Sequence, residues 1–323
     1  MATVTDTPQR QRAPSRTTSA PTASPFRQAT LTVAGALLDA TSRGVRAIPT
    51  AQRYVPADAI TTPLTRLLRA RRRTIATNYA VMLGTTPDDP LARWLAGESI
   101  RNYGRMAIDF LASRTMSPEQ ARALATARGE EHLRDALSDG KGVIFVLPHF
   151  GSWDVAAVLA SSFGCRLTVV TESDWLTELV AGSRQSAGVT LAPRDRSLRA
   201  LFRALARQEC VVMLTDVIND GVLSMEVPFF GSPAPFPMGP ARLAEHTGAP
   251  IMVASAWRKP DHTFHIEGQA PLRADPARST EENVYALTAE IARGFERVIA
   301  PHPEQWYPFH PIWPRLTASS PHD

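Results

Sequence analysis

The sequence is poor in cysteine and in long hydrophobic runs. Cys165 and Cys210 are the only cysteines among 323 residues, and each lies in or beside an apolar, strand-like segment. We therefore expect buried free thiols rather than a disulfide, and hence a reducing compartment. No run of about 18 apolar residues occurs, which argues against a transmembrane helix. The first 28 residues are rich in Ser, Thr, Pro and Arg and lack an apolar core, so they predict a disordered tail and not a secretory signal.

Several chemical signatures are also missing. There is no internal repeat, no Gly-rich phosphate loop, no CxxC or HExxH metal pattern and no GxSxG nucleophile elbow. Lysine is nearly absent, because Lys141 and Lys259 are the only two. The basic side chains are almost all arginine, which suits phosphate groups on lipids, cofactors or nucleic acids. The net charge of +4 is mild, and no nucleic-acid-binding module is recognisable, so we expect no nucleic-acid partner.

Helical periodicity dominates roughly the first 135 residues. It predicts helices over residues 30–48, 63–84, 90–112 and 117–127, with Ser117 as the cap of the fourth. The second helix carries a cluster of arginines at one end: Arg66, Arg69, Arg71, Arg72 and Arg73. This cluster is either a solvated basic face or a surface that contacts lipid headgroups, and the sequence leaves both readings open.

After residue 135, short β-rich runs alternate with helical stretches, and a long helix is predicted over 279–300. The alternation predicts an α/β fold, with a mostly parallel central sheet flanked by helices and an N-terminal helical, membrane-associating segment. The expected organisation is a disordered tail over 1–28, amphipathic helices over 29–135, an α/β catalytic core over 136–316 and a tail over 317–323. Functional side chains should gather where the parallel strands end.

The stretch "VIFVLPHFGSWDVAAVLA", residues 143–160, places a titratable pair at a junction between a strand and a helix. On one continuous helix, side chains five apart diverge by roughly 140°, so His149 must precede the helix that carries Asp154. The two can then converge, with Asp154 accepting from one imidazole nitrogen and leaving the other as a base. No serine or cysteine nearby is an obvious nucleophile, which favours direct attack by a substrate hydroxyl. The alternative is a loop histidine and an aspartate that only favours the helix N-terminus.

The residues "HFGSWD" resemble the HxxxxD signature of glycerolipid and lipid A type acyltransferases. Further stretches, in the same order, resemble the bacterial late lipid A acyltransferase family, which includes the phosphatidylinositol mannoside acyltransferases. They are "RRRTIATNYAVMLG", "SIRNYGRMAIDFL", "EVPFFGSPAPFPMGPARLAEHTGAPIMV" and "HPEQWYPFH". Phe150 and Ser152 depart from the family's usual residues, a smaller one and an asparagine, beside the expected acceptor site.

The resemblance implies O-acyl transfer with His149 as general base and Asp154 as the residue that orients it. The acceptor alkoxide would attack the thioester of acyl-CoA or of an acyl carrier protein, with no cofactor and no metal. The acceptor would be a hydroxyl of a glycolipid or lysophospholipid.

Four further residues are expected to bind substrate. The resemblance assigns Glu172 to the sugar acceptor, Arg184 to phosphate or a carbonyl oxygen, and Asp216 to an acidic position after a strand. Alternation along a strand puts Glu226 and Pro228 on one face, which can turn Glu226 toward the cleft. In each case a surface or structural role is the alternative.

Membrane attachment would be peripheral or monotopic, at the cytoplasmic face of the plasma membrane, through arginines that contact anionic lipid. Three other readings stay open. The same site could acylate a soluble acceptor or hydrolyse thioesters, the chain could be a non-catalytic lipid-binding protein, or His149, Asp154 and Glu172 could bind a metal.

Overall fold

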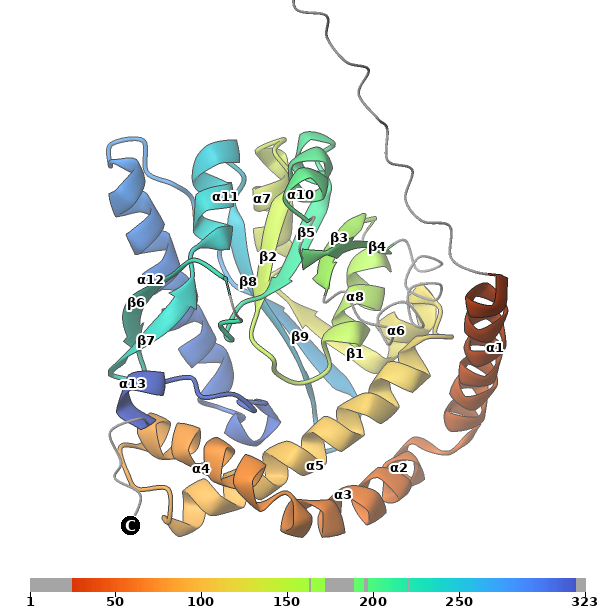
Figure 1. The fold of residues 1–323 in the computed structure, drawn as a ribbon. Coiled ribbons are helices and arrows are strands. Elements are labelled where there is room, and N and C mark those ends of the chain that lie inside the picture. Colours follow the sequence, from red (N-terminus) through yellow and green to blue (C-terminus); the bar gives the residue numbers. More distant parts are fainter. Residues whose placement is uncertain (1–24, 163, 172–188, 195–196, 220, 318–323) are drawn as a thin grey trace, which may run out of the picture.

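A computed structural model describes residues 25–162, 164–171, 189–194, 197–219 and 221–317 (Figure 1). A seven-stranded sheet has the order β1-β9-β8-β2-β5-β3-β4, and β6 and β7 form a separate two-stranded sheet. The strands are β1 Ala125–Arg128, β2 Val143–Leu147, β3 Leu167–Thr171, β4 Val189–Pro193, β5 Cys210–Leu214, β6 Ser224–Phe229, β7 Ser232–Pro237, β8 Ile251–Arg258 and β9 Phe264–Gly268.

The helices precede, interrupt and follow these strands. They are α1 Pro25–Ala47, α2 Thr50–Arg53, α3 Val55–Leu67, α4 Arg69–Leu83, α5 Pro90–Ser113, α6 Pro118–Leu124, α7 Glu130–Ser138, α8 Trp153–Ser162, α10 Ser197–Ala206, α11 Gly239–Thr247, α12 Thr280–Ile299, the 3₁₀ turn η2 Pro303–Gln305 and α13 Pro314–Thr317. The long, periodic helices at 90–112 and 279–300 were predicted nearly to the residue.

The central sheet is mostly parallel, as predicted. β2 pairs in parallel with β5 and β8, and β3 pairs in parallel with β5 and β4. Only the edge runs the other way, because β9 is antiparallel to β8 and β1 follows β9. All five residues of β2 are buried, which explains its uninterrupted apolar sequence: a parallel strand is covered on both faces.

The N-terminal helices share the core of the sheet. Helices α1, α3 and α4 pack along α5, and α4 and α5 cover one end of the molecule (Figure 1). Ile75 and Tyr79 of α4 lie in the same buried cluster as Ile144 of β2 and Phe295 of α12. The predicted boundary at residue 135 therefore does not separate two cores, and β1 already belongs to the sheet.

Two predicted helices end differently in the structure. The helix expected over 63–84 is two helices, because Leu68 (φ −83°, ψ 50°) interrupts it between α3 and α4. Ser117 begins α6 with a capping box, as predicted, but the helix ends at Leu124 and the next four residues become β1. Pairing of β1 with β9 overrides the local helical preference. Residues 1–24 of the predicted tail lie outside the described residues.

The C-terminal segment after α12 is tied to α4 by one buried amide. Asn78 donates to the carbonyls of Pro308 and His310, both at 2.8 Å, and its carbonyl oxygen accepts from the backbone of Ile312 at 3.0 Å. Asn78 is fully buried, as are its bonds to Pro308 and Ile312, and each bond contributes to the stability of the folded state. The segment is thus held against the N-terminal helices by side-chain chemistry and not only by packing.

We expect Asn78→Ala to lower the free energy of unfolding by about 3 kcal/mol, because three backbone groups lose their partner and each bond contributes about 1 kcal/mol. Thr77→Ala is the matched control on the same helix, since the Thr77 hydroxyl bonds only within α4, to the carbonyl of Arg73. Urea denaturation of both variants measures the difference. Equal stability of the two variants would show that the Asn78 amide does not hold the segment.

Candidate active site

His149 and Asp216 meet because their strands are neighbours in register. Leu147 at the end of β2 pairs with Leu214 at the end of β5. His149 and Asp216 each follow two residues later, so both leave the sheet at the same edge, where parallel strands end. Thr215 continues the pairing through a backbone bond to Leu147 at 3.1 Å.

The Asp216 carboxylate is fully engaged. Its Oδ1 lies 2.6 Å from Nδ1 of His149, while its Oδ2 accepts from the backbone N–H of His149 at 2.9 Å and from the indole N–H of Trp306 at 3.0 Å. The Asp216 side chain is 0% exposed and that of His149 is 35% exposed. The ring is therefore held at one nitrogen, and part of it stays accessible.

Burial and charge act in opposite directions on this pair. Burial by itself would lower the pKa of His149, but the negative charge of Asp216 and the hydrogen bond to it outweigh burial and raise that pKa above its ordinary value. Burial by itself would raise the pKa of Asp216, but His149 and the bond from Trp306 lower it. With Nδ1–H donating to the carboxylate, the Nε2 lone pair is available as a base.

A cavity of about 1430 Å³ borders His149, and Trp153, Asp154 and Tyr307 line it too. Phe145 and Leu147 line its wall on β2 and point to the same face of the sheet. Further apolar walls come from Ala157, Val212, Leu214, Met252 and Ala254. A basic imidazole thus lies next to a large apolar space, an arrangement that can bring a polar reacting group and a hydrocarbon chain together.

The loop that carries His149 requires a glycine. Gly151 has φ +61°, and a Cβ at this position would lie 1.8 Å from the carbonyl oxygen of Ala256. The Gly151 N–H donates to the carbonyl of Gln305 at 2.8 Å, and Tyr307 N–H donates to the carbonyl of His149 at 2.8 Å. The C-terminal segment therefore holds the loop at both ends.

The partner of the imidazole differs from the one expected. Asp154 lies in the first turn of α8 and lines the cavity with His149, but the carboxylate on Nδ1 belongs to Asp216. An argument from spacing compares only residues that are close in the sequence. The pairing of β2 with β5 places His149 beside a residue 67 positions away. Asp216 was expected among the substrate-binding residues, and it is instead the residue that orients the ring. A catalytic role of Asp154 stays a prediction.

Glu226 lies on the surface. The predicted alternation is correct, because Glu226 and Pro228 are exposed while Val227 and Phe229 are buried, but the exposed face is turned to solvent. Strand β6 pairs with β7 and not with the central sheet, and Glu226 forms an ion pair with Arg315 at 3.0 Å. Glu226 is absent from the described residues that line the cavity. Glu172 and Arg184 lie outside the described residues.

Four more residues hold the site and were not predicted as site residues from the sequence: Trp306, Tyr307, Asp109 and Arg258. The block "HPEQWYPFH" contains the first two and was noted without a role. The buried pair of Asp109 and Arg258 left no local signal, because one is on α5 and the other ends β8. Among the described residues, no three His, Cys, Asp or Glu side chains gather where they could hold a metal ion.

The sequence profile described as "Bacterial lipid A biosynthesis acyltransferase" matches residues 27–315. The chain belongs to this family. It is therefore an acyltransferase of the lipid A and phosphatidylinositol mannoside acyltransferase type, as the resemblance predicted.

The chain is also similar to proteins named phosphatidylinositol mannoside acyltransferase. A phosphatidylinositol mannoside acyltransferase of Mycobacterium tuberculosis (strain CDC 1551 / Oshkosh) is 32% identical over 252 residues, 73% of this chain and 75% of that one. That of Mycolicibacterium smegmatis is 32% identical over 193 residues, 57% of this chain and 60% of that one. The crystal structure of the Thermotoga maritima 1-acyl-sn-glycerophosphate acyltransferase PlsC covers 74% of this chain and 98% of its own, with 17% identity and a TM-score of 0.37, too low to bear on the site.

Asp216→Asn should reverse the tautomer of His149. Oδ2 accepts from two N–H donors, so the amide oxygen of an asparagine must take that position and its NH₂ group must face Nδ1. The proton then moves to Nε2 and the base is blocked, with an expected loss of about 100-fold or more in kcat. In the wild-type enzyme, kcat/KM should rise with pH as His149 loses its proton, with a pKa above the ordinary value of histidine. In the variant this rise should be absent or shifted to lower pH.

Rate measurements across pH on purified protein check this expectation. Asp261→Asn is the control, because that carboxylate is 63% exposed and its partners, Lys259 and Thr263, lie in its own turn. An Asp216→Asn enzyme with a wild-type rate and pH profile would show that the carboxylate does not set the state of the ring.

Proposed function

We propose that the protein moves a fatty acyl group from acyl-CoA or acyl carrier protein to a hydroxyl of a glycolipid or lysophospholipid, with His149 as general base. The observation that carries this proposal is the His149–Asp216 hydrogen bond of 2.6 Å beside a large apolar cavity. Family membership supports the reaction class. The phosphatidylinositol mannoside acyltransferases among its relatives favour a phosphatidylinositol-mannoside-like acceptor over a lipid-A-like one.

The chemical step follows from the tautomer. Nε2 of His149 takes the proton of the acceptor hydroxyl, and the oxygen forms a bond to the thioester carbonyl carbon. The carbon–sulfur bond then breaks, and the thiolate leaves with the proton that Nε2 returns. One ester and one thiol result, and the imidazole is again neutral. Asp216 stabilises the imidazolium that exists between the two proton transfers.

A covalent acyl-enzyme is not required by this geometry. The nearest hydroxyl in the loop, that of Ser152, is buried and donates to Asp109, so it is turned away from the imidazole. Transfer in one complex fits the size of the cavity, which exceeds the range of about 300–1,000 Å³ typical of small-ligand pockets. The space accommodates a hydrocarbon chain together with part of the acceptor.

His149→Ala should lower acyl transfer by about 100- to 10,000-fold, the contribution typical of a general base. The assay supplies labelled acyl-CoA with phosphatidylinositol mannosides or lysophospholipids and follows labelled lipid and free thiol. His132→Ala on α7 is the control, because its ring is exposed. Full activity of His149→Ala would contradict the mechanism, and thiol release without a labelled lipid would support a thioesterase instead.

We also propose that the enzyme attaches to anionic lipid through a surface on α3 and α4, here called the arginine–leucine face: Val55, Ile60, Leu64, Leu67 and Leu68 with Arg66, Arg69, Arg71, Arg72 and Arg73. Ile60 is 67% and Leu67 78% exposed. None of the five arginines has an acidic partner among the described residues. Arg71 donates to the carbonyl of Phe309, a cavity residue, at 2.9 Å, so this face adjoins the cavity.

The same face and the thiols support a proposal for the location. Among the described residues, no helix has the length and apolarity to span a bilayer. Cys165 and Cys210 are buried and unpaired, as predicted. Free thiols fit a reducing compartment. We therefore propose peripheral binding at the cytoplasmic face of the plasma membrane.

Arg69→Ala with Arg73→Ala should weaken binding to vesicles of phosphatidylcholine and phosphatidylglycerol by roughly 30-fold, because each arginine near an anionic surface contributes about 1 kcal/mol. Co-sedimentation measures the change, and vesicles of phosphatidylcholine alone should bind weakly to both proteins. Arg199→Ala with Arg203→Ala is the matched control: both are exposed, they have the same spacing, and α10 lies at the opposite end of the molecule from α4 (Figure 1). Equal weakening by the two pairs would contradict the assignment of this face.

A further inference from the structure

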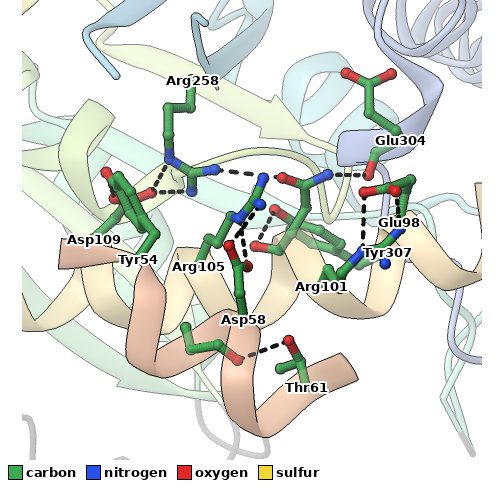
Figure 2. A network of polar contacts seen from close by, with 12 residues as sticks. Tyr54, Asp58, Thr61, Glu98, Arg101, Arg105, Asp109, Arg258, Glu304 and Tyr307 are labelled. Carbon is green, nitrogen blue, oxygen red and sulfur yellow. Dashed lines mark hydrogen bonds and ion pairs between the residues drawn. The ribbon is translucent and has the colours of Figure 1, made fainter. Parts of the chain in front are cut away.

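A buried polar cluster lies behind the His149 loop, and the acyl-transfer step does not use it. Asp109 on α5 is 2% exposed and pairs with Arg258, the last residue of β8, through Nε at 3.1 Å and through a second guanidinium nitrogen (Figure 2). The hydroxyl of Tyr54 donates to Oδ1 at 2.6 Å, and the hydroxyl of Ser152 donates to Oδ2. One carboxylate therefore joins four segments of the chain.

Ser152 is the member of this cluster that belongs to the catalytic loop. Its carbonyl accepts from the N–H of Ala156 at 3.3 Å, which makes it the residue that begins α8. A serine at this position usually turns its oxygen onto the first turn of its own helix. Here the hydroxyl donates outward to Asp109, and since a carboxylate only accepts, the direction of this bond is fixed.

Backbone bonds extend the same attachment. Ser152 N–H donates to the carbonyl of Ala256 at 2.8 Å, two residues before Arg258. The Gln305 side chain bonds both the N–H and the carbonyl of Arg258, each at 2.9 Å. Hydrogen bonds therefore attach the loop to the end of β8 and to α5, and not only to α8.

We propose that Ser152 and Asp109 are positioning residues for acyl transfer: their hydrogen bond sets where the loop of residues 149–154 presents the imidazole to the acceptor hydroxyl. This inference rests on the proposed function. A displacement of about 1 Å in a reacting group can cost on the order of 100-fold in rate, so an attachment three residues from His149 is close enough to matter. Tyr54 bonds the same carboxylate but lies outside the loop, so its hydroxyl does not position His149.

Ser152→Ala and Tyr54→Phe form a matched pair, because each removes one buried hydroxyl donor from the same carboxylate and leaves the ion pair with Arg258 intact. Both should lower thermal stability to a similar extent. Ser152→Ala should reduce kcat by roughly 10- to 100-fold with an unchanged KM for acyl-CoA, whereas Tyr54→Phe should keep the wild-type kcat. The assay uses the full chain with labelled acyl-CoA and the lipid acceptor.

Equal kcat values in the two variants would overturn the proposal, because a merely structural bond affects both alike. Ser152→Cys is the second variant: it keeps the size of the side chain and weakens the donor, so its kcat should also fall, and a wild-type kcat would again overturn the proposal. A wild-type enzyme that transfers no acyl group would contradict the proposed function, and this inference with it. A wild-type enzyme that is active, beside a fully active Ser152→Ala, contradicts the inference alone.

Discussion

The hydrogen bond from the indole of Trp306 to Asp216, 3.0 Å long, is the contact on which the site depends. The indole is fully buried, and the Trp306 carbonyl accepts from the hydroxyls of Ser99 on α5 and Tyr79 on α4. One residue of the C-terminal segment therefore links the N-terminal helices to the carboxylate that holds the base. The helices that carry the arginine–leucine face and the imidazole of His149 are parts of one hydrogen-bonded unit.

Two buried carboxylates have different structural roles in this unit. Asp216 holds the ring, and Asp109 is bonded to the loop that carries the ring. Each is removed from water at a cost that only several donors can offset, and each has them: backbone, imidazole and indole N–H groups for Asp216, and a guanidinium with two hydroxyls for Asp109. Removing one member of a buried ion pair typically costs about 3–5 kcal/mol, so such clusters resist piecemeal change.

The sequence predicted many of the elements but not their order in space. Strand β2 and helices α5 and α12 were predicted because their periodicity is strong and their ends carry Pro, Ser or Gly. His149 was identified because a titratable residue stands where a buried strand ends. Its partner was not, since the position of β5 beside β2 follows from the packing of the whole sheet. The same limit explains Glu226: its strand and the alternation of side chains were right, but β6 pairs with β7 and the Glu226 side is exposed to solvent.

The spacing in "HFGSWD" follows from how each intervening residue is packed. Phe150 is buried and its backbone forms an isolated antiparallel β-bridge with Trp306. Gly151 lies against the carbonyl of Ala256, where no Cβ fits. Ser152 is buried against Asp109, and Trp153 meets the imidazole edge-on with ring centroids 5.8 Å apart.

Phe150 and Ser152, which the sequence analysis placed beside the acceptor, therefore face the protein interior, each 1% exposed. Their departures from the family pattern change the support of the loop and not the surface that a substrate meets. Within this loop, the side chains that reach the cavity are those of His149, Trp153 and Asp154. Asp154 therefore borders the cavity, while Asp216 holds the ring.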